Sequence, residues 1–287
     1  MFGRIAVSLL ILAAIPCARA QEIFRDDFNG TSFDASKWFV HEFALGRTDF
    51  RMGPTIAGGV ASIPIDTYDP RAPGVAFSGT ELETNASFSR GAGLEFEARI
   101  RFNDPLPTGL VAAMFLYGYN SAKNTSDEID YEFLTNQMDD PAQRDRALLT
   151  TFNDWDFDYA NHSNDGIHMR TVNPSIPGID WTQWNTFMIR WLPGRVDWVV
   201  NGRTVSSATE AVADEPMSLR FDVWAPGSDW PAAYDAGIQP EANSALNTRY
   251  SYEVDSIVVR SIPEPSAAAL FLLGMAALSL KAWIRRR

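Results

Sequence analysis

Cysteine is almost absent from this chain of 287 residues, because Cys17 is the only one. It falls in an N-terminal segment, residues 1–20, that has a basic start, an apolar run and a small-x-small pattern ending at Ala20. This arrangement is typical of a secretory signal peptide cut before Gln21. A lipoprotein anchor on Cys17 is the alternative, which Pro16 directly before it disfavours. Cleavage leaves an exported chain without disulfides, so its stability must come from core burial.

Positive charge is also scarce. Residues 21–263 hold 18 of the 24 Lys and Arg and 35 of the 36 Asp and Glu, a formal net charge of −17. Such a domain repels nucleic acid and anionic membrane surfaces. An anionic polysaccharide is a poor partner for the same reason, and a neutral glycan fits better.

Histidine is rare, and no serine stands in a Gly-x-Ser-x-Gly pattern. His41, His162 and His168 are the only histidines, and the last two share a polar loop with no evident third zinc ligand. These absences disfavour both a Ser/His/Asp hydrolase and a zinc centre.

Amphipathic helices and internal repeats are missing as well, and residues 21–262 have the size of one domain. Residues 94–102 alternate apolar and charged side chains, as a half-buried strand does. Residues 187–192 and 196–200 flank Pro193-Gly194, and Asn201-Gly202 is a hairpin signal. Short strands at this spacing predict an all-β fold, a two-sheet antiparallel β-sandwich.

The C-terminal segment, residues 263–287, joins Pro263-Glu264-Pro265 to an apolar run and a terminal arginine cluster. The apolar run reaches the lower limit of a membrane helix only if it continues to Ile284. The segment resembles the bacterial PEP-CTERM sorting signal, and a plain membrane anchor is the alternative. The resemblance implies transient anchoring in the inner membrane, removal by export and sorting machinery, and release outside the cell or at its surface.

Residues 126–136 read SDEIDYEFLTN, in which Glu128, Asp130 and Glu132 take every second position. In a strand this spacing puts the three carboxylates on one face, with Ile129 and Tyr131 on the other. Like charges on one face repel, so folding gains nothing from them. Cleavage of a glycosidic bond needs two placed carboxyl groups, one ionised and one protonated. A half-solvated strand face and a calcium or magnesium site are the alternatives.

Five segments, taken in order, resemble the family-16 glycoside hydrolases, especially the lichenase and xyloglucan-transglycosylase branch. Residues 109–136 are similar to the catalytic hairpin of that branch, with Glu-x-Asp-x-Glu and no extra bulge residue. The other similar segments are residues 24–38, 77–84 with 93–102, 184–203 and 252–259. The resemblance implies a concanavalin-like jelly roll with a concave substrate cleft. It also implies an endo-acting β-glycanase that cleaves a neutral β-glucan-type polysaccharide with retention of configuration.

By position in the motif, the resemblance implies that Glu128 is the nucleophile, Asp130 the assisting carboxylate and Glu132 the acid/base. Four residues of flat strand separate the Cα atoms of Glu128 and Glu132 by about 13 Å. Retaining catalysis needs the two carboxyl groups about 5–5.5 Å apart. We therefore expect this strand to curve so that the two side chains converge.

Trp224 and Trp230 lie in VWAPGSDW, a polar, turn-rich segment. We expect both rings at a cleft edge, where they could stack on sugar, with burial in the core as the alternative. The resemblance also implies a structural calcium on the convex face at Asp255, for which a solvated strand aspartate is the alternative. Catalysis itself requires no cofactor.

Three positions depart from the family pattern and leave the sugar open. Ser126 stands where an aromatic residue is usual, Leu82 where an arginine is expected, and Asp222 where an asparagine is common. A transglycosylase on the same scaffold and a non-catalytic glycan-binding matrix protein remain alternatives. The presence of both Glu128 and Glu132 favours an enzyme, which we expect to be a monomer.

Overall fold

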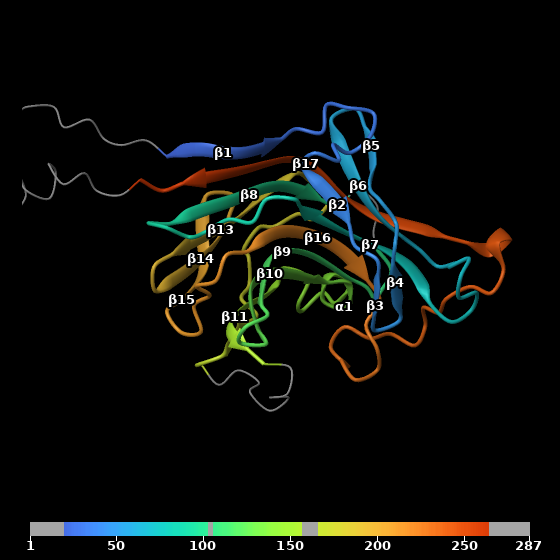
Figure 1. Cartoon of the computed structure of the whole chain (residues 1–287). Coiled ribbons are helices and arrows are strands. Elements are labelled where there is room, and N and C mark those ends of the chain that lie inside the picture. The colour runs from blue at the N-terminus through green and yellow to red at the C-terminus, as the bar shows by residue number, and fades with distance from the viewer. Residues whose placement is uncertain (1–19, 103–105, 157–165, 264–287) are drawn as a thin grey trace, which may run out of the picture.

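The computed structural model describes residues 20–102, 106–156 and 166–263 (Figure 1). Its elements are β1 (Gln21–Asp26), β2 (Trp38–Val40), β3 (Phe43–Leu45), β4 (Thr48–Phe50), β5 (Thr55–Ala57), β6 (Val60–Asp66), β7 (Phe77–Thr84), β8 (Leu94–Arg101), β9 (Val111–Asn120), β10 (Thr125–Leu134), α1 (Thr135–Asp139), β11 (Leu148–Trp155), β12 (Met169–Val172), β13 (Asn185–Leu192), β14 (Arg195–Val200), β15 (Arg203–Ala208), β16 (Ser218–Trp224), the 3₁₀ turn η1 (Ser244–Leu246) and β17 (Arg249–Ser261).

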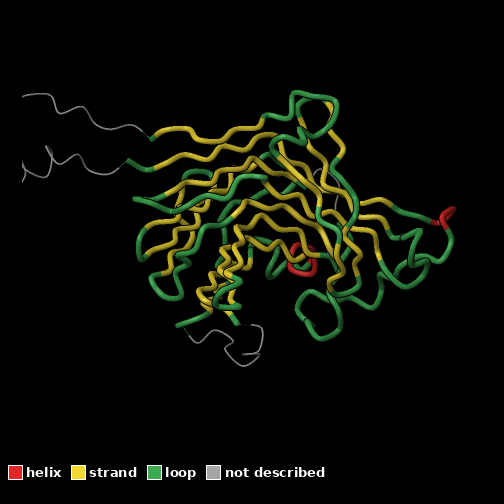
Figure 2. The backbone as a smooth tube through the Cα atoms, in the orientation of Figure 1, coloured by secondary structure: helices red, strands yellow, loops and turns green. Residues whose placement is uncertain are grey.

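The strands form two bent layers, seen one above the other in Figure 1 and as yellow segments in Figure 2. The outer sheet runs β15-β14-β13-β8-β17, with β1 and β6 pairing along the far side of β17. The inner sheet runs β12-β11-β10-β9-β16-β7-β2. These pairings are antiparallel, and the parallel pair β4–β7 is the exception. The predicted all-β sandwich is confirmed.

The hairpins predicted from turn residues are present. Strand β13 pairs with β14 across a turn in which Gly194 has φ of 70°. Strand β14 then pairs with β15 across Asn201 and Gly202, whose φ values are 49° and 76°. Positive φ at both central residues matches the twist of a two-residue hairpin, which explains the choice of Asn-Gly there.

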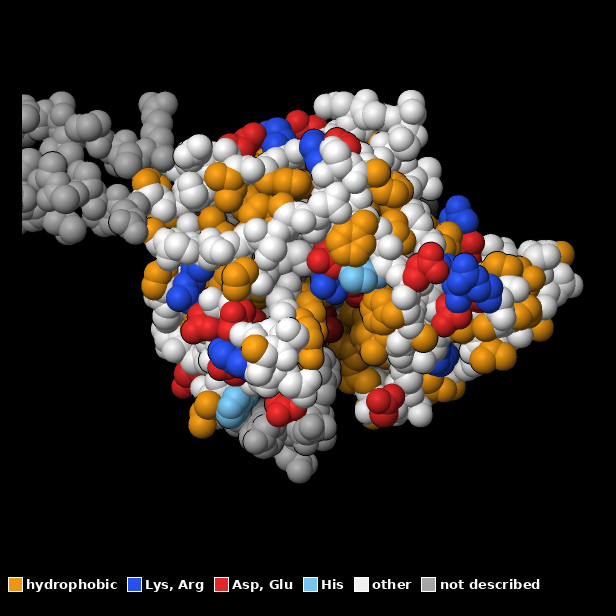
Figure 3. Space-filling model, viewed as in Figure 1, with side chains coloured by type: hydrophobic (Ala, Val, Ile, Leu, Met, Phe, Trp, Pro, Cys, Tyr) orange, Lys and Arg blue, Asp and Glu red, His pale blue; other side chains and the backbone are white. Residues whose placement is uncertain are grey.

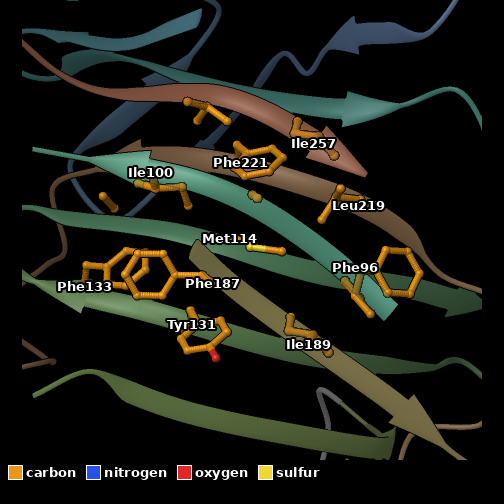
Figure 4. Close-up of a cluster of buried hydrophobic side chains, with 14 of the residues drawn as sticks. Phe96, Ile100, Met114, Tyr131, Phe133, Phe187, Ile189, Leu219, Phe221 and Ile257 are labelled. Carbon is orange, nitrogen blue, oxygen red and sulfur yellow. The ribbon is translucent and has the colours of Figure 1, made fainter. Parts of the chain in front are cut away.

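The core lies between the two sheets and fixes which face of β10 points inward. Ile129, Tyr131 and Phe133 are fully buried, and the Phe133 and Phe187 ring centroids are 5.0 Å apart (Figure 4). The Tyr131 hydroxyl donates to main-chain carbonyls of the outer sheet, at 3.1 Å. The indole N–H of Trp198, on β14, donates to the Asp130 carbonyl at 2.8 Å. Because these buried polar groups are satisfied, β10 is held in one register.

The two ends of the described domain are neighbours, since Gln21 pairs with Ser261. The predicted signal peptide and C-terminal sorting segment lie outside the described residues, except for Ala20 and Pro263. Within the described ranges no helix is long and apolar enough to cross a membrane.

Candidate active site

The concave face of the inner sheet carries alternate residues of four neighbouring strands, β10, β9, β16 and β7, in register. Each row of paired residues starts on β10 and crosses β9, β16 and then β7. The first row is Glu132, Ala113, Asp222 and Glu81, and the second is Asp130, Phe115, Arg220 and Glu83. The third row is Glu128, Tyr117 and Ser218, which ends on β16. Directly paired residues of antiparallel strands point to the same face. The three carboxylates predicted on one face of β10 therefore meet further carboxylates from β16 and β7.

A groove of about 530 Å³ crosses this face, and all three carboxyl groups of the β10 triplet line it. Figure 3 shows the same face hollowed, with hydrophobic side chains in the depression. A second groove of about 500 Å³, lined by Leu148, Phe152 and Trp230 among others, also reaches Glu132. Glu132 thus stands where the two grooves meet, and a chain-like ligand could pass over it.

The triplet sits on a strand without an inserted residue. Pairing of β10 with β9 is regular from Thr125 to Leu134, and the irregularity opposite Glu128 lies in β11, where Asp154 has φ of 48°. Glu128 and Glu132 are partly exposed to the groove, whereas Asp130 is buried. An Asp130 oxygen accepts a hydrogen bond from the Thr150 N–H at 2.7 Å.

The pKa of each carboxyl group in the β10 triplet is raised. Burial, then the charge of Glu132, raises the pKa of Glu128 to about 8, against an opposing effect of Arg220. Burial raises the pKa of Glu132 to about 7. Burial and neighbouring carboxylates raise the pKa of Asp130 and Asp222 well above the ordinary range. The site can therefore offer a proton donor and an ionised carboxylate near neutral pH.

The roles of the two glutamates depend on which of them is ionised. The motif assigns Glu128 as the nucleophile, so the reaction requires ionised Glu128 and a proton on Glu132, while the pKa of both is raised. Arg220 is the side chain whose charge favours ionised Glu128.

Trp224 lines the first groove and Trp230 lines the second. Their ring centroids are 5.8 Å apart and both side chains are partly exposed. The loop between them is held by Arg47, a residue that the sequence did not single out. Its guanidinium donates to the Pro226 carbonyl at 2.8 Å and lies 4.7 Å from the Tyr234 ring centroid.

A charged cluster on the far wall of the groove was not predicted from the sequence. The carboxylates of Glu81 and Glu83 receive the guanidinium of Arg220 at 2.8 and 2.9 Å, and His41 contacts both carboxylates. Leu82, taken as the residue in place of the expected arginine, is buried in the core. The guanidinium in this groove comes from β16 instead. Alternation was the signal available in the sequence, because Glu81 and Glu83 are two positions apart and so are Arg220 and Asp222. Alternation places each pair on one face of its strand, but it does not show that the two strands pair.

Two places bear on metal binding. His41, Glu81 and Glu83 offer ligand atoms within 4.8 Å of one another, but the Arg220 guanidinium already binds both carboxylates, so we assign no metal there. Asp255 lies on the outer sheet, and its carboxylate forms an ion pair with Arg99 at 2.7 Å. A calcium ion at Asp255 would have to compete with that arginine, and the calcium expectation stays a prediction.

Known proteins that are similar to this chain in sequence or fold include glycoside hydrolases. A family model described as "Glycosyl hydrolases family 16" matches residues 54–242. A xylanase/beta-glucanase of Ruminococcus flavefaciens is 28% identical over 175 residues, which are 58% of this chain and 18% of that protein. A beta-glucanase of Acetivibrio thermocellus is 24% identical over 263 residues, 88% of this chain and 69% of that protein. The chain thus spans under a fifth of the first relative.

Solved structures of similar fold include a prokaryotic beta-1,3-1,4-glucanase (lichenase) from a mouse hindgut metagenome. It aligns with a TM-score of 0.64 at 18% identity and covers 84% of this chain and 100% of its own. An endo-beta-1,3-glucanase from Pyrococcus furiosus aligns with a TM-score of 0.65 at 21% identity, covering 86% and 96%. At these identities the likeness establishes the jelly-roll fold.

The raised pKa of Glu128 predicts a cost in stability that grows with pH. Between its ordinary value of 4.5 and about 8, the folded protein keeps a proton that the unfolded chain has lost, so the free energy of unfolding falls as pH rises. We expect Glu128→Gln to raise Tm at pH 8 and to change it little at pH 4.5. Calorimetry at both pH values tests this. Glu42→Gln, on an exposed side chain, is the control, and an equal gain at both pH values would contradict the account.

Proposed function

Because the chain belongs to the glycosyl hydrolases family 16, we propose that it is an exported, endo-acting β-glucanase. It cleaves a neutral β-glucan-type polysaccharide and retains the configuration at the anomeric carbon. The observation that carries this proposal is the position of Glu128, Asp130 and Glu132 on the floor of one groove, with raised pKa values for all three.

The two glutamates divide the reaction between them. Ionised Glu128 attacks the anomeric carbon while Glu132 gives its proton to the leaving oxygen, which forms a glycosyl ester on Glu128 and releases the first product. Glu132, now ionised, takes a proton from water, whose oxygen attacks the same carbon and frees Glu128. Asp130 lies between the glutamates along β10, and burial, then the charges of Glu132 and Glu128, raise its pKa.

Endo action is supported by the continuity of the grooves. The first groove runs past Glu128 toward Trp224, and the second leaves Glu132 past Trp230, so sugar units can occupy both sides of the cleaved bond. Indole rings stack well on the C–H faces of sugars. The surrounding carboxylates disfavour an anionic polysaccharide and are compatible with an uncharged glucan.

A transglycosylase is the second candidate, and the second groove is the observation that favours it. Its lining is mainly apolar and includes Phe152, Met169 and Trp230. A glycan chain held there could replace water as the acceptor of the glycosyl group from Glu128. Release of a product longer than the starting oligosaccharide would distinguish transfer from hydrolysis.

The nucleophile assignment predicts a specific rescue. Glu128→Ala should lower turnover of a β-1,3-1,4-glucan by several orders of magnitude, because the covalent step loses its attacking group. Azide should restore part of the rate and give a glycosyl azide of inverted configuration, since it enters the vacated space. Rates and product anomers are measured by reducing-sugar assay and NMR. Glu253→Ala, on the outer sheet, is the control, and a near-normal rate for Glu128→Ala would exclude this mechanism.

Export and sorting are part of the proposal and rest on residues 1–20 and 263–287 of the sequence. Protein recovered from the medium or cell surface should begin near Gln21 and lack the residues after Pro263-Glu264-Pro265. Replacing that motif with three alanines should leave the protein in the membrane. Intact-mass measurement checks both statements, and a released protein that still carries Arg287 would contradict them.

A further inference from the structure

Arg220 is fixed in the wall of the first groove from three directions. One end of its guanidinium binds Glu81 at 2.8 Å and the other binds Glu83 at 2.9 Å. Its plane lies over the Tyr117 ring, with 4.4 Å from the guanidinium carbon to the ring centroid. Its side chain is only 14% exposed. A guanidinium held at both ends and stacked on a ring cannot leave the groove without breaking all of these contacts.

His41 extends the network from the chain that follows β2. Its imidazole contacts Glu83 and lies 3.7 Å from Glu81, so it binds the same two carboxylates that hold Arg220. With both glutamates placed in this way, the guanidinium is anchored in the wall. Its two terminal nitrogens bind carboxylates of β7, and its Nε donates to the Ser218 hydroxyl at 3.4 Å.

The position of the Arg220 guanidinium matters because few positive charges lie near Glu128. Its cross-strand partner is Tyr117, the residue on which Arg220 rests. The other residues on this face of β7, β9, β10, β11 and β16 are neutral or acidic, and the titratable ones are Tyr119, Asp130, Glu132, Asp222, Glu81 and Glu83. Among the residues that line the first groove, Arg220 and His41 are the two that can carry positive charge.

We propose that Arg220 is a positioning residue that acts through Glu128, because its anchored positive charge favours the ionised carboxylate that the reaction needs. The proposal rests on the proposed function for the role of Glu128, but the charge effect itself does not depend on catalysis. Glu81 and Glu83 hold the guanidinium, and Tyr117 sets its distance from Glu128.

The balance of effects on Glu128 agrees with this role. Its pKa is raised by burial, then by Glu132 and, least, by Glu81, and Arg220 is the group that lowers it. An opposite charge on the same groove face favours the ionised form of a carboxyl group and so lowers its pKa. Without Arg220, Glu128 would hold its proton to still higher pH, and the reactive state with ionised Glu128 and protonated Glu132 would become rarer.

Carbon-13 NMR of protein labelled at glutamate carboxyl carbons tests this directly. The Glu128 resonance, assigned with Glu128→Gln, is followed against pH in the full chain without substrate. Arg220→Gln should raise the Glu128 midpoint by about 1 unit or more. Arg220→Lys, which keeps the charge, should stay closer to the wild type. Lys123→Gln removes a cation outside the groove and should leave the midpoint unchanged.

Arg220→Gln leaves two partly buried glutamates without their partner and could unfold the protein. The double variant Arg220→Gln/Glu83→Gln removes one cation and one anion, so the amides can pair, and it should still raise the midpoint. An unchanged or lowered midpoint in the folded variant would overturn the proposal.

Kinetics separate this proposal from the proposed function. In Arg220→Gln the acid limb of the kcat/KM profile should move to higher pH, whereas a purely structural role would lower the whole profile without moving it. If the wild type cleaves no glucan and the NMR midpoint still moves, the proposed function fails, while the effect of Arg220 on the charge of Glu128 stands.

Discussion

The register of β10 against β9 decides which side chains enter the groove and which enter the core. Ile129, Tyr131 and Phe133 are fully buried on one face, so Glu128, Asp130 and Glu132 must lie on the other. A slip of one residue would exchange the two sets and bury the glutamates among aromatic rings. The Tyr131 hydroxyl and the Trp198 indole also donate hydrogen bonds to main-chain carbonyls, and these bonds form only in the observed register.

The same register gathers carboxyl groups on a half-buried surface, which is unfavourable for folding. The groove lowers that cost by favouring the neutral forms of Asp130 and Asp222, whose pKa values are raised, and by pairing Glu81 and Glu83 with Arg220. Desolvated like charges are what raise carboxyl pKa values into the range that glycosidic cleavage uses. Stability is therefore lower at this face because the arrangement serves chemistry, a common trade in enzymes.

The parts of the site that the sequence could predict are local. Alternation within residues 126–136 was enough to place the triplet on one face, and Asn201-Gly202 was enough to locate a hairpin. The Arg220 cluster was not predictable in the same way, because Arg220 and Glu81 are 139 positions apart and meet only through the pairing of β16 with β7. The Trp224 and Trp230 segment was recognised, but Arg47, which holds it, comes from the distant β3–β4 turn.

In the proposed function, Glu128 and Glu132 cleave a β-glucan in two displacements, the first of which forms a glycosyl ester on Glu128. Proton NMR of a β-1,3-1,4-glucan during the first minutes of reaction, before the products mutarotate, tests it most directly. A retaining reaction releases the β-anomer first, and the α-anomer then grows in slowly by mutarotation. Release of the α-anomer first would mean that water attacks directly, and Glu128 would then not be the nucleophile.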